Sequence, residues 1–308
     1  MPPKTLRLPK TRRHFVEWVM VNNNDKKTLA ALKRDFKYHD MDLADTAPPL
    51  QSTKLAVRED YLFMILLYPV FDKKTRIIST AEIDFFIEPN RLVVVDPFGL
   101  PQLQDLYNKF EGGELQHAHD VPQLLFVILE TLIEAIYPMI RHMTVDVEDI
   151  ESKLFKNFER SLIKELLRVK TNIVSVRKAI QGHKAVIRKL VAASRGRFIS
   201  VDKLQEYFDK LVEETKDIWD RLDLQKNTID ALHETNVSLL DYQTNDIMKT
   251  LTIISVTTFP LTLFATLFAT RAAGMPLVNN PYGFWILSGI ILVIAALMIV
   301  FFKRKRWL

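Results

Sequence analysis

The stretch that decides the fold of this chain reads Thr244-Asn-Asp-Ile-Met-Lys-Thr-Leu-Thr-Ile-Ile-Ser-Val-Thr-Thr-Phe-Pro-Leu-Thr-Leu-Phe-Ala-Thr-Leu-Phe268. It carries a polar segment into an apolar one of nearly membrane-spanning length. One set of its residues recurs at alternating steps of three and four, which places them on one face of a helix: Asn245, Met248, Thr252, Ser255, Phe259, Thr262 and Thr266. This face is mostly small and polar, whereas Ile253, Ile254 and Leu261 lie off it. A hydroxyl-rich face on an otherwise apolar helix predicts contact with other helices or with a water-filled path.

A second apolar run follows after a short loop. Residues 284–302 carry no charge, and both runs approach the roughly 20 residues that a bilayer-spanning helix needs. The chain then reads Lys303-Arg-Lys-Arg-Trp-Leu308, and a basic cluster with a Trp at a helix end is typical of a cytoplasmic anchor. We therefore expect transmembrane helices at 250–268 and 284–302, an extracytoplasmic loop at 269–283 and a basic cytoplasmic tail at 303–308. Both termini would be cytoplasmic, and residues 1–13 show no signal peptide.

Composition bounds the remaining possibilities. The chain has 308 residues, a net charge of +5 and no cysteine, so disulfides and thiolate metal sites are excluded. Basic residues are interleaved with acidic ones, which argues against nucleic acid as a partner. The sequence has no Walker loop, dinucleotide fingerprint or HExxH motif. We expect no enzyme activity, passive transport, and no cofactor other than divalent cations.

The N-terminal third, residues 1–100, is predicted to be a cytoplasmic α/β domain. The pattern predicts a strand at 14–21, a helix at 26–36, a buried strand at 61–68, and a hairpin that joins strands 77–87 and 91–95. Apolar runs of this kind predict a central sheet covered by helices on both faces.

Residues 101–249 are predicted to form a helical cytoplasmic domain and stalk. Asp120 is placed to cap a helix that covers 122–143. Asp202 can cap a second helix that runs unbroken through Phe268, a length of about 100 Å. Such a length is typical of a stalk that joins a cytoplasmic body to a membrane pore.

The chain resembles the CorA family of magnesium and divalent metal ion transporters. The resemblance is carried by Thr244-Asn-Asp-Ile-Met-Lys-Thr-Leu-Thr-Ile-Ile254, Phe259-Pro-Leu-Thr262, Met275-Pro276, Pro281-Tyr-Gly-Phe-Trp285 and the basic tail, with weaker support from Tyr38-His-Asp-Met-Asp-Leu-Ala-Asp45 and Glu59-Asp-Tyr-Leu-Phe63. It implies a funnel-shaped homopentamer in the inner membrane of a prokaryote. It also implies that the first transmembrane helix lines the pore.

The chain departs from the family at the outer pore mouth. The family signature there is Gly-Met-Asn, and the corresponding residues are Ala269, Thr270 and Arg271. A fivefold ring of Arg271 would repel divalent cations, because Arg stays protonated in proteins and residues 272–283 offer no acidic residue. Arginine rings are expected in anion pores. The alternative is that Arg271 snorkels to lipid headgroups or pairs with a neighbour.

The resemblance also assigns roles within the pore. Asn245 matches a polar ring at its cytoplasmic end, and Met248, Leu251 and Phe259 match apolar rings that can gate by dewetting. Ordinary helix packing is the alternative. The hydroxyls of Thr252, Ser255, Thr262 and Thr266 either line the path or bond their own backbone.

Regulation in the family is thought to use divalent ions held by Asp side chains between cytoplasmic domains. Here Lys210, beside Asp209, occupies one such position, while Glu234 retains an acidic group nearer the membrane. The acidic segment 40–45 could bind metal or remain a solvated loop.

These observations predict a CorA-like pentameric ion channel whose selectivity has moved away from hydrated Mg²⁺, toward anions or weak selectivity. Two alternatives stay open. One is a divalent-cation transporter that keeps the family activity, and the other is a non-conducting membrane scaffold or regulator.

Overall fold

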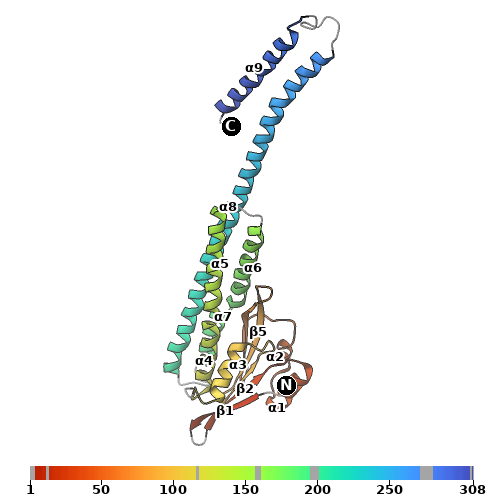
Figure 1. Cartoon of the computed structure of the whole chain (residues 1–308). Coiled ribbons are helices and arrows are strands. Elements are labelled where there is room, and N and C mark those ends of the chain that lie inside the picture. The colour runs from red at the N-terminus through yellow and green to blue at the C-terminus, as the bar shows by residue number, and fades with distance from the viewer. Residues whose placement is uncertain are drawn as a thin grey trace. The chain divides into compact units, whose positions relative to one another are not determined.

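The chain folds into two compact units, Met1–His233 and Glu234–Leu308. The computed structural model describes residues 4–11, 14–115, 118–156, 161–194, 201–270, 280–305 and 307 (Figure 1). The strands are β1 (Lys4–Thr11), β2 (His14–Val21), β3 (Lys54–Val57), β4 (Leu62–Asp72), β5 (Ile77–Ile87) and β6 (Arg91–Val95). The helices are α1 (Lys26–Phe36), α2 (Asp40–Asp45), α3 (Pro101–Glu111), α4 (Val121–Glu134), α5 (Ile136–Lys156), α6 (Ser161–Ile180), α7 (His183–Ser194), α8 (Val201–Ala269) and α9 (Gly283–Arg304).

The first unit is built on one six-stranded sheet with the order β1-β2-β6-β5-β4-β3. Neighbouring strands are antiparallel except β2 and β6, which are parallel. The antiparallel pairing of β5 with β6 confirms the hairpin predicted from the sequence. The strand predicted at 14–21 and the helix predicted at 26–36 are also confirmed at the predicted residues.

Helices cover both faces of the sheet. On one face, Leu32 of α1 and Leu43 of α2 pack with Phe63 and Phe86, and Tyr38 stacks on Phe86 with ring centroids 4.1 Å apart. On the other face, Trp18 of β2 meets Tyr107 of α3 edge-on at 5.1 Å. Helices α4, α6 and α7 also contact the sheet. Both faces of the central strands are therefore shielded from solvent, which explains the continuous apolar runs in their sequences.

Two strands and one helix break differ from the sequence prediction. The edge strands β1 and β3 were not predicted. Strand β1 tolerates Pro9, which has no N–H, because an edge strand has a neighbour on one side only and does not need every N–H for pairing. The helix predicted at 122–143 is two helices, since α4 ends at Glu134 and α5 begins at Ile136. Pro138 explains the break, because it has no N–H to donate to the carbonyl of Glu134. Asp120 caps α4 as predicted, with its carboxylate accepting from the N–H of Gln123 at 2.8 Å.

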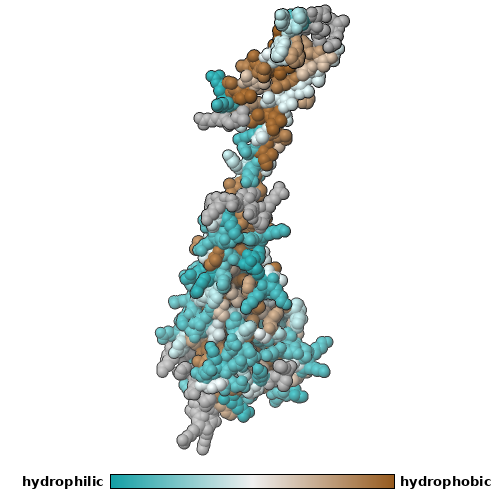
Figure 2. Space-filling view, in the orientation of Figure 1, coloured by the Kyte–Doolittle hydropathy of each residue, from teal (hydrophilic) through white to brown (hydrophobic). Residues whose placement is uncertain are grey.

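Helix α8 confirms the unbroken helix predicted from Asp202 through Phe268. In the second unit, the apolar end of α8 and helix α9 form an antiparallel hairpin (Figure 1). Hydrophobic residues form much of the visible surface of this hairpin in Figure 2, whereas hydrophilic residues cover most of the visible surface of the first unit. Leu292 is 70% exposed and Trp285 is 73% exposed in the single chain.

Candidate functional site

The residues predicted to line a pore lie along one exposed face of α8. Phe259 is 78% exposed, Leu251 57% and Met248 56%. Asn245, Ser255, Thr262 and Thr266 are exposed as well, and Thr252 is half-buried. The single chain therefore leaves this face largely uncovered and free to meet water, lipid or other copies.

The threonine hydroxyls on this face donate to their own helix. The hydroxyl of Thr252 donates to the carbonyl of Met248 at 2.7 Å, that of Thr262 to Thr258 at 2.8 Å, and that of Thr266 to Leu263 at 2.9 Å. Because each hydroxyl proton is already used, the outward side of each oxygen offers only lone pairs. This arrangement suits a passing cation better than an anion, since an anion needs hydrogen-bond donors.

The pore-mouth residues lie where α8 ends. The helix stops at Ala269, and the Thr270 hydroxyl donates to the carbonyl of Leu267 at 2.6 Å. Arg271, which was predicted to oppose divalent cations, lies outside the described residues, and its role stays a prediction.

Lys210 is held by carboxylates from two helices. Its ammonium lies 2.6 Å from Glu130 Oε1 of α4 and 3.6 Å from Glu214 Oε1 of α8. The hydrogen bond to Glu130 raises the pKa of Lys210. Burial raises the pKa of Glu214. The negative charges of Glu130 and Glu134 raise this pKa further, whereas the positive charge of Lys210 lowers it.

This cluster places a fixed positive charge among three glutamates. Sequence reasoning singled out Lys210 but missed both partners. Glu130 could not be found from local sequence because it lies on α4, far away in the chain, whereas the four-residue spacing from Lys210 to Glu214 on α8 was a signal that could have found Glu214. The other two predicted regulatory residues, Asp209 and Glu234, are exposed on α8.

The acidic segment 40–45 has internal partners. Asp42 is buried, and its carboxylate accepts hydrogen bonds from Arg58 Nε at 2.8 Å and from the Tyr61 hydroxyl at 2.7 Å. Burial would raise the pKa of Asp42, but these hydrogen bonds outweigh it and hold the pKa below its usual value. Asp45 pairs with Lys54. Within the described part of the chain, no group of three or more His, Asp or Glu side chains is placed to hold a metal ion.

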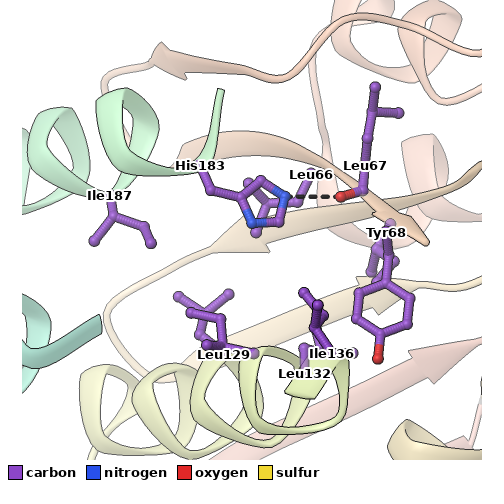
Figure 3. A pocket seen from close by; sticks show the side chains of 10 residues that line it. Leu66, Leu67, Tyr68, Leu129, Leu132, Ile136, His183 and Ile187 are labelled. Atoms are coloured by element: carbon purple, nitrogen blue, oxygen red, sulfur yellow. Dashed lines mark hydrogen bonds between the residues drawn. The ribbon is translucent and has the colours of Figure 1, made fainter. Parts of the chain in front are cut away.

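A small cavity lies under the sheet beside His183, with a volume of about 10 Å³ (Figure 3). Its lining is apolar apart from His183 and Tyr68, and includes Leu66, Leu129 and Ile187. His183 Nε2 lies 2.7 Å from the carbonyl oxygen of Leu67, and burial lowers the pKa of His183 to about 4. A space of this size holds one water molecule at most. The cavity is therefore part of the core packing and not a ligand site.

Three helical stretches of the described chain are long and apolar enough to cross a membrane, judged by length and composition: Val121–Leu154, Gln205–Ala269 and Gly283–Arg304. In the first, half of the apolar window is buried inside the protein. Leu124 and Ile128 there are fully buried, so packing accounts for its apolar character. The windows of the other two have no buried share.

The sequence profile of the family described as CorA-like Mg2+ transporter protein matches residues 15–304. The chain belongs to the CorA family. The cobalt/magnesium transport protein CorA of Thermotoga maritima is 23% identical over 283 residues, which cover 89% of this chain and 78% of that protein. The CorA protein of the same description from Methanocaldococcus jannaschii is 23% identical over 258 residues, or 82% of this chain and 79% of that protein.

Solved structures agree with the CorA fold. The complete structure of the CorA magnesium transporter from Methanocaldococcus jannaschii matches with a TM-score of 0.82 at 19% identity, covering 95% of this chain and 92% of that one. The full-length CmaX protein matches with a TM-score of 0.76 at 17% identity, covering 96% and 89%. At these identities the likeness establishes the fold, an α/β domain joined to a long helix.

Proposed function

We propose that this CorA-family protein is a passive ion channel of a prokaryotic inner membrane, with a selectivity shifted away from hydrated Mg²⁺. Five copies would assemble around α8, with both termini in the cytoplasm. The observation that carries the proposal is the uncovered face of α8 from Asn245 to Thr266, where polar groups alternate with large exposed apolar ones. If several copies packed with this face of α8 toward a common axis, they would shield the face from lipid and enclose a narrow path that the face lines.

Membrane insertion is supported by the surface of the second unit. The exposed apolar side chains of α9 would each be unfavourable in water by roughly 1.5–3 kcal/mol relative to burial. Hydrocarbon removes this penalty. Helix α9 has 22 residues, which gives about 33 Å and matches the thickness of the hydrocarbon core.

The proposed shift in selectivity rests on Arg271. In a pentamer, five guanidinium groups would stand where the family carries its signature Asn, and no acid between residues 272 and 283 offsets them. Two unit charges 10 Å apart repel by roughly 0.4 kcal/mol in bulk water and by more at a protein surface. A divalent cation would meet five such repulsions, each doubled by its own charge.

Transport of Mg²⁺ or another divalent cation is the second candidate. The Thr252, Thr262 and Thr266 hydroxyls favour it, because their protons are committed to helix carbonyls and their oxygens can act toward an ion only as acceptors. The relatives from Thermotoga maritima and Methanocaldococcus jannaschii, both described as cobalt/magnesium transport proteins, point the same way.

Ion flux through liposomes that contain the purified protein separates the candidates. Parallel assays with Mg²⁺, K⁺ and Cl⁻ should show little Mg²⁺ flux compared with the other two. The triple change Ala269→Gly, Thr270→Met, Arg271→Asn should increase cation entry, and Arg271→Lys is the matched control that keeps the charge. Saturable Mg²⁺ uptake by the unchanged protein would favour the second candidate, and no flux of any ion would favour a scaffold.

Pore lining by α8 can be tested separately. Because the chain has no cysteine, single cysteines at 245–268 give an unambiguous labelling signal. Water-soluble reagents should label positions with a three-four period in the assembled protein. Uniform protection would argue strongly against a pore along this face.

A further inference from the structure

The second unit contains an apolar groove between α8 and α9, with a volume of about 440 Å³. It is lined by Val256, Ile294, Leu297, Met298, Phe301 and Phe302. Leu297 is 64% exposed and Phe301 is 58% exposed, so the groove is open along its side. Its wall is almost wholly non-polar, which suits a hydrocarbon chain.

Both helices place a lysine at the same end of this groove. Lys249 lies seven residues before Val256 on α8, and Lys305 lies seven residues after Met298 at the end of α9. Seven residues are two helical turns, about 10 Å, and return to the same face. The two helices run antiparallel (Figure 1), so helical spacing places both lysines toward the same end of the groove.

The basic groups at this end form no ion pair within the described part of the chain. Asp246 is the last acidic residue of the sequence, while Lys249, Lys303, Arg304 and Lys305 all follow it. Among the described residues, none of these four basic groups has a carboxylate within ion-pair distance. Residues 247–308 contain no acidic side chain, so the hairpin itself supplies none to neutralise them.

The end of the chain is folded back beside the groove. The N–H of Trp307 donates to the carbonyl of Phe302 at 3.1 Å, and the two rings stack with centroids 6.0 Å apart. This contact helps leave Phe302 only 5% exposed. A Trp beside basic residues is the composition found at the level of lipid headgroups.

We propose that the groove binds an acyl chain of an anionic phospholipid, with the headgroup phosphate held between Lys249 and Lys305. The inference rests on the proposed membrane location of α8 and α9. Basic pockets between membrane helices on the cytoplasmic side select anionic headgroups. An anionic phospholipid supplies both things that the site lacks, an apolar filling for the groove and a negative charge for the lysines.

The test is the lipid that the protein retains. Full-length protein is taken from nanodiscs of equal phosphatidylglycerol and phosphatidylcholine, and the bound lipids are counted by native mass spectrometry. Phosphatidylglycerol should dominate. Lys249→Gln with Lys305→Gln should lower that preference roughly 10-fold or more, because each basic group near a lipid surface contributes about fivefold. Leu297→Trp should fill the groove and reduce the number of bound lipids.

Matched controls come from the other side of α9. Lys303→Gln removes one charge that helical spacing places away from the groove, and it should change the preference less than twofold. Leu292→Trp adds the same bulk at a side chain that is 70% exposed on the opposite face, and it should leave lipid retention unchanged.

Several results would overturn the inference. Equal retention of both lipids would do so, as would full competition by millimolar inorganic phosphate. Loss of the oligomer in Leu297→Trp with no change in bound lipid would assign the groove to a neighbouring copy. Flotation with liposomes keeps the two proposals distinguishable. Protein that fails to float contradicts the membrane location, whereas protein that floats without lipid preference contradicts only the lipid site.

Discussion

The sheet of the first unit and the helical hairpin of the second contain the same kinds of apolar side chain in opposite surroundings. Phe85 and Phe86 of β5 are fully buried, whereas Leu292 and Trp285 of α9 are more than two-thirds exposed. Inside the first unit, apolar groups are removed from water by the protein itself. In the hairpin they are not, so another medium or another chain must cover them. The same side chains thus stabilise the first unit from within but leave the hairpin dependent on something outside the single chain.

The largest expected contrast comes from shortening one side chain in each region. Phe86→Ala removes a fully buried ring that stacks on Tyr38, and it should lower the free energy of unfolding by about 3–5 kcal/mol. Leu292→Ala should change it by less than about 0.5 kcal/mol, since it fills no internal space. Urea unfolding of the full chain in detergent, followed by tryptophan fluorescence, measures both. Comparable losses would mean that the exposed face of α9 is packed in the assembled protein.

The second expected effect is a pH dependence confined to the first unit. His183 has a pKa of about 4 in the fold because it is buried, compared with about 6.5 when unfolded. The fold therefore keeps its full stability above pH 6.5 and loses roughly 3 kcal/mol as the pH falls toward 4, because only the unfolded chain takes up the proton. His183→Gln should flatten this loss in unfolding measured from pH 7 to pH 4.5.

His119 provides the control for that experiment, because it is exposed and His119→Gln should leave the slope unchanged. Burial raises the pKa values of Glu82 and Asp84, which act in the opposite direction, so the difference between variants isolates His183. An unchanged slope in His183→Gln would show that another group carries the acid sensitivity.

The third effect compares two glycines. A Cβ at Gly182 would lie 2.7 Å from the Cβ of Thr53, so Gly182→Ala should destabilise the first unit by about 1–3 kcal/mol. A Cβ at Gly289 of α9 meets no atom within 4 Å. Gly289→Ala should gain about 0.5–1 kcal/mol from helix propensity. Thermal unfolding measures both, and a loss at Gly289 would reveal close helix packing between copies.

The smallest effect concerns Lys210. Its side chain is half exposed, so Lys210→Gln should lower stability by only about 0.2–1 kcal/mol. The informative readout is magnesium. Limited proteolysis of the unchanged protein should look the same with and without millimolar Mg²⁺, because the ammonium already pairs with Glu130 and Glu214 and repels a second cation. Lys210→Gln should introduce protection by Mg²⁺, and Lys216→Gln, on the exposed side of α8, should not. Strong protection of the unchanged protein from proteolysis by Mg²⁺ would contradict the expectation that Lys210 takes the place of a bound Mg²⁺.

The sequence predicted elements whose signal is local. The strand at 14–21 and the hairpin of β5 and β6 are long apolar runs bounded by turn residues, and the structure has them as predicted. Strand β3 is four residues long and only partly buried, so its apolar pattern was too weak to identify. The break at Ala135 was missed because the Pro138 that causes it lies inside a strongly apolar run.

For the candidate site, helical spacing was sufficient to place Asn245 to Thr266 on one face of α8, and the exposure of that face agrees with it. Whether the face lines a pore stays a prediction. The Lys210–Glu130 pair could not be predicted, because nothing local signals which helix α8 packs against.

The order of these regions along the chain has a consequence for biosynthesis. The last strand of the sheet ends at Val95, and the apolar end of α8 begins about 150 residues later. At a translation rate of 5–20 residues per second, that interval lasts roughly 8–30 seconds. Sheets of mixed topology fold within about milliseconds to seconds, so the parallel pairing of β2 with β6 can close before the hairpin leaves the ribosome. The apolar sheet can thus be buried before the apolar hairpin is synthesised, so the two regions need not be exposed to water at the same time.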